Sequence, residues 1–227
     1  PYKTKNRFDF EHPTNIGFSA GPEYNRYFKY QEHQDLLNAP AVIEEVERRF
    51  AQVFGRRYPG LVEAVQCEDA DYVLVTLGSA AGLVRTVVES LRAQGLRVGL
   101  LRIRYLRPLP TVALAAALGN AKAVAVLEKD VSFGAEGTVF TNVNSALQQA
   151  GVRVPTYDFI GGLGGDDIMP VQVEAIFRTL VRSVSEGVEV PRVSFLGIDD
   201  TPGAAAGTAA GPSGLVSDAC RDVKEAN

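Results

Sequence analysis

Residues 72–82 read YVLVTLGSAAG, and this stretch decides the fold class. Its first six residues form a continuous apolar, β-branched run, which is typical of a strand buried on both faces of a parallel sheet. Glycine and small residues then turn the chain into a helix that we expect to end near Ala93. A strand joined to a helix by a short turn is the unit from which α/β sheets are built.

The same unit recurs along the chain. Because repeated strand-turn-helix units form right-handed crossovers, we predict an α/β fold over residues 36–190: a three-layer sandwich with a parallel-dominated sheet. An edge strand at residues 61–65 can extend the sheet. Further strands are predicted at 98–103, 123–127 and 154–160, and helices at 111–118, 135–150 and 171–185.

The two ends of the chain lack this alternation. Residues 1–35 combine turn residues with aromatic ones, which favours an extended arm or interdomain linker over a disordered leader. Residues 191–227 are predicted to be a flexible tail or linker, because 204–214 contain almost only small residues. The chain begins at Pro1, so we expect a cleaved product or a fragment of a longer polypeptide.

A helix is predicted to begin at Pro40, because proline suits an early helical position, and to end at Gly55. We expect one face of it to pack onto the sheet. Its apolar residues recur every four positions at Val42, Val46, Phe50 and Phe54.

Composition argues against several classes of function. The formal charge of −4 without a cluster of lysine and arginine argues against nucleic acid or an anionic membrane as a partner. No apolar run is long enough to span a bilayer and residues 1–9 lack a signal-peptide core, so we expect a cytoplasmic protein with free thiols. Cys67 and Cys220 form no C-x-x-C pair, and His12 and His33 accompany no G-x-S-x-G motif, so neither a metal site nor a hydrolytic triad is expected.

Three strand ends carry candidate site residues. Gly78 and Ser79 begin a helix, where Ser79 is expected to be an N-cap; the alternative is an anion site at the helix N-terminus. Arg102, Arg104 and Arg107 follow the next strand. We favour ion pairs at a subunit or domain face for them over a phosphate or carboxylate clamp.

The residues that follow the strand at 123–127 are charged. Glu128, Lys129 and Asp130 end this strand, and Glu136 and Asn142 come after it. Paired carboxylates can perform acid/base catalysis when burial separates their pKa values, but charged residues at a strand end are ordinarily solvated. We therefore expect these residues to be solvated and name no catalytic residue.

A glycine-rich loop at residues 161–167 reads GGLGGDD. It comes too late in the chain for a Rossmann fingerprint, and it has acids where a phosphate loop has a lysine. Gly162, Gly164, Gly165 and Asp166 are instead candidates for a ligand contact or a contact between domains.

The ordered motifs resemble the second domain of 2-oxoacid:ferredoxin oxidoreductases, the family of pyruvate:ferredoxin oxidoreductase, over residues 21–176. This domain forms the carboxyl-terminal part of the alpha subunit and is similar to the carboxyl-terminal domain of transketolase. The matching segments are Gly55-Arg56-Arg57-Tyr58, Asp69-Ala70, Gly78-Ser79, Leu91 to Gly95, Val98 to Leu101, Arg107-Pro108-Leu109-Pro110, Val126 to Lys129, Gly134 to Gly137, and Gly162-Leu163-Gly164-Gly165.

The resemblance implies an enzyme that decarboxylates a 2-oxoacid with thiamine diphosphate and Mg2+. Electrons pass through 4Fe-4S clusters to ferredoxin or flavodoxin, and the usual product is an acyl-CoA. None of the family's catalytic residues maps onto this chain, so the resemblance implies a non-catalytic assembly domain that contacts other subunits or domains in a dimer of protomers.

Asp166 departs from the family, which commonly has arginine after Gly-Leu-Gly-Gly. The exchange reverses the local charge and would remove any carboxylate or phosphate pairing made there. Two other readings stay open at this point. One is a free-standing anion- or nucleotide-binding module, and the other is the equivalent domain of an E1 beta component or a transketolase.

Overall fold

The computed structural model describes residue 7, residues 9–13, residue 17 and residues 19–198. Most of the predicted amino-terminal arm before residue 19, and the tail after residue 198, therefore lie outside the described residues.

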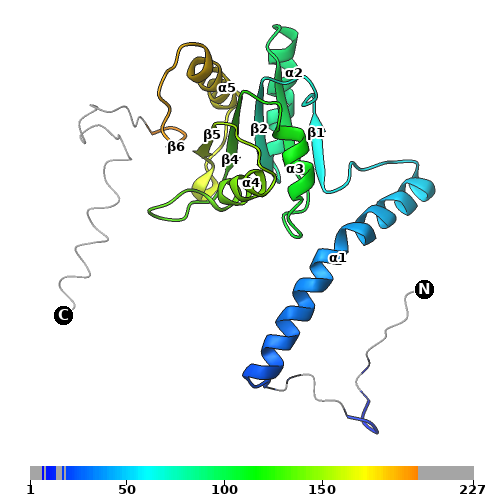
Figure 1. The fold of residues 1–227 in the computed structure, drawn as a ribbon. Helices are drawn as coiled ribbons and strands as arrows, with labels where there is room; N and C mark the ends of the chain where they lie inside the picture. Colours follow the sequence, from blue (N-terminus) through cyan, green and yellow to red (C-terminus); the bar gives the residue numbers. More distant parts are fainter. Residues whose placement is uncertain (1–6, 8, 14–16, 18, 199–227) are drawn as a thin grey trace, which may run out of the picture.

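The described chain forms one six-stranded sheet in the order β1-β3-β2-β4-β5-β6 (Figure 1). Only the edge strand β1 is antiparallel to its neighbour, which confirms the parallel-dominated α/β fold. The strands are β1 (Val62–Val65), β2 (Tyr72–Leu77), β3 (Val98–Ile103), β4 (Ala123–Glu128), β5 (Thr156–Ile160) and β6 (Val193–Phe195).

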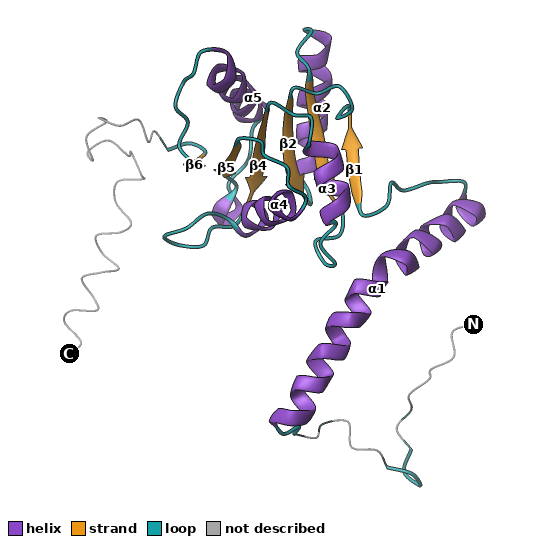
Figure 2. Ribbon diagram, in the orientation of Figure 1, coloured by secondary structure: helices purple, strands orange, loops and turns teal. Residues whose placement is uncertain are grey.

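Helices cover both faces of this sheet (Figure 2). On one face, Leu74 packs in a core with α2 (Ala80–Ala93) and α5 (Pro170–Ser185). On the other, Val73 and Val75 pack in a second core with α3 (Thr111–Leu118) and α4 (Thr138–Gln149). Successive side chains of a strand point to opposite faces, so an uninterrupted apolar run supplies both cores. The predicted three-layer sandwich is confirmed.

The end of the described chain differs from the prediction. Residues 193–195 form β6, which pairs in parallel with β5, whereas we expected structure to decay after Pro191. Three residues with a single apolar-polar-apolar alternation are too short a pattern to distinguish an edge strand from a loop.

The helix before the sheet also differs from the prediction. A single helix, α1 (Pro22–Phe54), replaces the extended arm expected up to residue 35, and Pro40 lies inside it instead of at its start. Pro22 begins the helix, and Gly55 ends it in a left-handed conformation with φ of 66°.

The expected packing of α1 onto the sheet is wrong as well. No residue of α1 is buried, and the helix extends away from the sandwich (Figure 1). Val42 and Phe54 are 62% and 59% exposed. A periodic apolar face predicts that a helix packs against something, but it does not identify the partner.

Glycine at position 99 is required by close packing, which makes Gly99→Ala a test of the fold. An added Cβ would lie 2.8 Å from the Gln66 carbonyl oxygen and 3.1 Å from the Cys67 sulfur. We expect overpacking to lower the free energy of unfolding by about 1–3 kcal/mol in urea denaturation. Gly82→Ala is the matched control: its Cβ meets nothing within 4 Å, so a helical alanine should stabilise the fold by about 0.5–1 kcal/mol. Equal effects of the two variants would contradict this packing.

Candidate functional site

A cleft lies where the order of the strands reverses. From β2 the chain passes to β3 on one side, and the next strand, β4, lies on the other side of β2. In open α/β sheets such a switch point leaves a crevice outside the carboxyl ends of the strands, where ligands bind. Here the cleft measures about 290 Å³, and its lining residues are Thr76, Leu77, Gly78, Ser79, Ala80, Leu127, Glu128, Lys129, Asp130, Val139 and Ile168.

Gly78 and Ser79 lie in this cleft at the start of α2. Gly78 adopts a left-handed conformation with φ of 66°, which glycine reaches without strain. Ser79 occupies the N-cap position, but its side chain makes no capping hydrogen bond, so the predicted capping role of the hydroxyl is wrong. The hydroxyl is exposed at the cleft.

The N-terminus of α4, at the same edge of the sheet, is capped by three carboxylates. Asp158 accepts a hydrogen bond from the Gly137 amide, at 2.8 Å, and Asp130 accepts one from the Thr138 amide, at 3.4 Å. Glu128 accepts two, both at 2.8 Å, from the amides of Val139 and Phe140. These are the amides that a helix leaves without backbone partners, so acidic side chains of this chain occupy the place where an anion could bind.

Glu128 and Asp158 form a buried carboxyl pair. They are 4% and 0% exposed, so the expectation that the charges at this strand end are solvated is wrong for Glu128. Burial raises the pKa of Asp158 to about 7, and the negative charge of Glu128 acts in the same direction. Burial also raises the pKa of Glu128, although the two amides that it accepts oppose the shift.

A proton on Asp158 fits the polar surroundings of this pair. The Oδ1 atom of Asp158 is buried and has no hydrogen-bond partner within the described chain, and a proton held between Asp158 and Glu128 would satisfy it. Gly137 makes room for the pair, because a Cβ there would lie 2.3 Å from the Glu128 carboxyl group. Sequence reasoning missed Asp158 because it lies within an apolar strand, 30 residues after Glu128.

The glycine-rich loop meets the cleft through a single lysine. Gly162 has φ of 73°, and a Cβ there would lie 2.7 Å from Cε of Lys129, so the lysine side chain crosses the bare glycine backbone. Gly164 and Gly165 are also left-handed and lie on the surface with Asp166. Of the loop residues singled out in the sequence, only Gly162 therefore packs against a residue that lines the cleft.

The arginines lie apart from the cleft. Arg102 pairs with Glu63 at 3.4 Å, and Arg104 pairs with Glu47 of α1 at 2.6 Å, so both form ion pairs within the chain, and their expected place at a subunit or domain face stays a prediction. Arg107 donates to the carbonyl of Leu106. A clamp between Ser79 and these arginines is not formed in the described chain.

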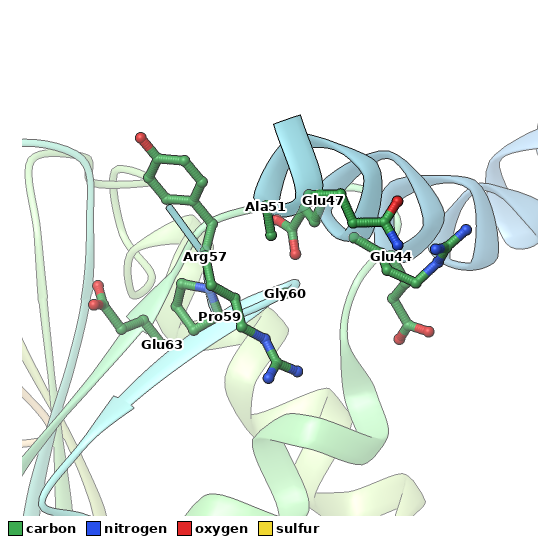
Figure 3. Close-up of a pocket in the computed structure, with 10 residues that line it drawn as sticks. Glu44, Glu47, Ala51, Arg57, Pro59, Gly60 and Glu63 are labelled. Carbon is green, nitrogen blue, oxygen red and sulfur yellow. The ribbon is translucent and has the colours of Figure 1, made fainter. Parts of the chain in front are cut away.

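A second, larger cavity separates α1 from the sandwich. It measures about 1120 Å³ and lies between one face of α1 and the segment that leads into β1 (Figure 3). Arg104 bridges these two walls, because its guanidinium also donates to the Gly60 carbonyl at 2.5 Å. Tyr58 and Tyr105 lie 5.3 and 5.6 Å from the same guanidinium, in the range of cation–π contacts.

Neither a membrane-spanning helix nor a metal-binding cluster occurs among the described residues. None of their helices is both long and apolar enough to cross a membrane. Their histidine, cysteine and acidic side chains form no group of three that could hold a metal ion.

The carboxyl pair predicts a pH dependence of stability that Asp158→Asn should remove. Burial raises the pKa of folded Asp158 to about 7 from an ordinary value of 3.8, so the folded state binds more protons between these values. Its contribution to the free energy of unfolding is therefore complete below pH 4 and falls, by up to ~4 kcal/mol, as the pH rises to 7. An asparagine can accept from Gly137 and donate to Glu128 at every pH.

We therefore expect Asp158→Asn to match the wild type near pH 4.5 and to exceed it in urea denaturation at pH 8. The exposed Asp167→Asn is the matched control and should keep the wild-type pH profile. A pH profile of Asp158→Asn that parallels the wild type would contradict the shared proton.

Comparison with known proteins places this chain in a family. Residues 70–173 match the model of the pyruvate:ferredoxin oxidoreductase core domain II. The chain is 38% identical over 170 residues to the pyruvate synthase subunit PorA of Methanothermobacter thermautotrophicus, which covers 75% of this chain and 43% of that subunit. It is 37% identical over 179 residues to the ketoisovalerate oxidoreductase subunit VorA of Pyrococcus horikoshii, which covers 79% and 45%.

The similarity to a third relative extends further along the chain. Identity to the pyruvate synthase subunit PorA of Pyrococcus furiosus is 31% over 198 residues, which covers 87% of this chain and 50% of that subunit. The chain thus spans half or less of the length of the curated relatives that it matches. It belongs to the family of 2-oxoacid:ferredoxin oxidoreductases, in which residues 70–173 correspond to core domain II.

Proposed function

We propose that this chain is an assembly part of the alpha subunit of an enzyme that oxidatively decarboxylates a 2-oxoacid. Electrons pass to ferredoxin or flavodoxin, and the usual product is an acyl-CoA. In this proposal thiamine diphosphate, Mg2+ and the 4Fe-4S clusters are bound by other domains or subunits. The chain itself packs those parts together within a dimer of protomers.

The observation that carries this proposal is the extent of the similarity. An alignment that covers 198 of 227 residues must include residues 30–198, so it reaches well beyond core domain II and into α1. Helix α1 exposes apolar side chains and has no buried residue. A helix of this kind in a family of subunits supports a role in contacts outside the sandwich.

The 2-oxoacid is proposed only as a class. One group of relatives is named for pyruvate and another for ketoisovalerate, at nearly the same identity to this chain. Their side chains differ by two methyl groups, so the proposal names 2-oxoacids as a class. The alternative of a free-standing anion-binding module loses support, because Arg102 and Arg104 pair with glutamates of this chain.

Reconstitution tests the proposed function. The purified chain alone should not reduce methyl viologen when given a 2-oxoacid, CoA and thiamine diphosphate. Co-expression with the thiamine- and cluster-binding parts of a PorA-type enzyme should give a complex that contains this chain and catalyses the reduction. An active complex that forms equally well without the chain would overturn the assembly role.

Asp166→Arg tests whether the glycine-rich loop contributes to assembly. Asp166 is exposed, and no ion pair of its side chain is found within the described chain, so a charge reversal there should leave the unfolding of the isolated chain unchanged. We expect it to change the affinity of the chain for the other parts of the enzyme, measured by titration calorimetry, because reversed charges alter electrostatic complementarity. The matched control is Asp167→Arg. Equal affinities for wild type and Asp166→Arg would show that the substitution is incidental.

A further inference from the structure

Helix α1 is joined to the sandwich by polar contacts and has no buried residue of its own. Within the described part of the chain, the Glu47–Arg104 pair is the one ion pair or hydrogen bond between α1 and the sandwich. Its side chains are only 13% and 17% exposed. The pair of Arg49 with Glu45, which lies within α1, is 69% and 38% exposed and contributes little to where the helix lies.

The sandwich side of this contact is anchored in the sheet. The amides of Arg104 and Tyr105 donate to the carbonyl of Leu61, at 3.0 and 3.2 Å, and so continue the pairing of β3 with β1. From this base the Arg104 guanidinium donates to Glu47 at 2.6 Å and to the Gly60 carbonyl at 2.5 Å. One arginine therefore joins the edge of the sheet, the segment before β1 and the helix.

The segment between α1 and β1 is built to bend. Gly55 and Gly60 stand at its two ends with φ of 66° and 75°, and a Cβ at either position would meet nothing within 4 Å. Residues 56–59 between them belong to neither a helix nor a strand. Small, unpacked residues at the ends of elements are the positions that absorb backbone rotation in a hinge.

Tyr58 links this segment to both of its neighbours. Its ring lies 5.6 Å from the ring of Phe50 in α1 and 5.3 Å from the Arg104 guanidinium. The Phe50 contact ties the helix to the segment, but only the guanidinium ties the segment and the helix to the sheet. Without Arg104, α1 and residues 55–60 could turn together and leave both cores of the sandwich intact.

We propose that Arg104 is the latch of a hinge: it fixes the direction of α1 through Glu47 and the Gly60 carbonyl, and α1 swings about Gly55 and Gly60 when this latch is open. The cavity of about 1120 Å³ between α1 and the sandwich leaves room for the motion, and Figure 3 shows Glu47 and Gly60 on its two walls. An open latch also returns the enclosed carboxylate of Glu47 to water, which favours movement of the helix over an unpaired charge.

The link between the latch and assembly rests on the proposed function. A helix held in one direction presents its exposed side chains to the other parts of the enzyme without the entropy cost of ordering it during binding. With the latch open, α1 has that direction for only a fraction of the time, and its affinity for those parts falls by the same fraction.

Distances between two spin labels test the latch in the isolated full chain. In a Cys220→Ser background, Gln31→Cys labels an exposed position of α1 and Ser90→Cys labels an exposed position of α2, while the native Cys67 is buried. Position 31 lies about 36 Å along the helix from Gly55, so a swing of about 20° moves its label by about 12 Å. Pulsed electron paramagnetic resonance resolves a displacement of this size.

The wild-type chain should give one narrow distance distribution, and Arg104→Gln should broaden it by about 10 Å or more. Arg102→Gln is the matched control, because it removes the same charge from an arginine that pairs with Glu63 inside the sandwich. It should keep the narrow distribution. A broad distribution in the wild type, or a narrow one at the wild-type distance in Arg104→Gln, would overturn the latch.

Glu47→Gln opens the latch from the helix side and leaves every side chain of the sandwich unchanged. It should broaden the distribution as Arg104→Gln does, and the double variant should be no broader than either single one, because both remove the same contact. Broadening in Arg104→Gln alone would show a local distortion of the sheet edge and contradict the latch. The urea unfolding of the sandwich in Glu47→Gln should match the wild type.

Titration calorimetry with the other parts of a PorA-type enzyme separates the latch from the proposed function. Arg104→Gln should bind them about tenfold more weakly if α1 keeps its direction for about a tenth of the time. Unchanged affinity in a chain whose labels show a released α1 would overturn the link between the latch and assembly. A wild-type chain that shows the latch but joins no complex would overturn the proposed function and leave the latch standing.

Discussion

Burial of β2 on both faces is the constraint on which the rest of the sandwich depends. Its backbone groups pair with β3 on one side and β4 on the other, and its side chains enter two separate cores. An apolar strand in this position needs helices above and below it, which the right-handed crossovers supply. The reversal of strand order between β2 and β4 follows from covering both faces, and it opens the cleft at their carboxyl ends.

The two helices that begin at this cleft differ in how their N-termini are capped. The amides at the start of α4 donate to Glu128 at the end of β4 and to Asp158 within β5, which joins the helix to the sheet through charge-assisted hydrogen bonds. Burial of both carboxyl groups disfavours their ionisation, so the pKa of each is raised. The start of α2 has small residues and an uncapped serine instead, so its side of the cleft stays open.

Helix α1 reverses the usual arrangement of a surface helix. Its polar side faces the protein, where Glu47 and Arg104 form the most enclosed ion pair between α1 and the sandwich, and several of its apolar side chains, such as Val46 and Val53, are exposed. A stable single domain would gain nothing from this arrangement, because it leaves apolar area in water. It becomes favourable when another surface covers these apolar side chains, which supports the assembly role.

The sequence by itself determined the sandwich and the family. The continuous apolar runs at residues 72–77, 98–103 and 123–127 are removed from water only when their strands are buried on both faces of a sheet. These local patterns place the strands and most helices to within a few residues. Tertiary structure alone decided three things. It brought Asp158 to Glu128, because strand order and not spacing along the chain sets which strand ends meet. It paired Arg104 with Glu47, 57 residues away. It also turned the apolar side of α1 outward, since helical periodicity describes a face but not the surface that the face meets.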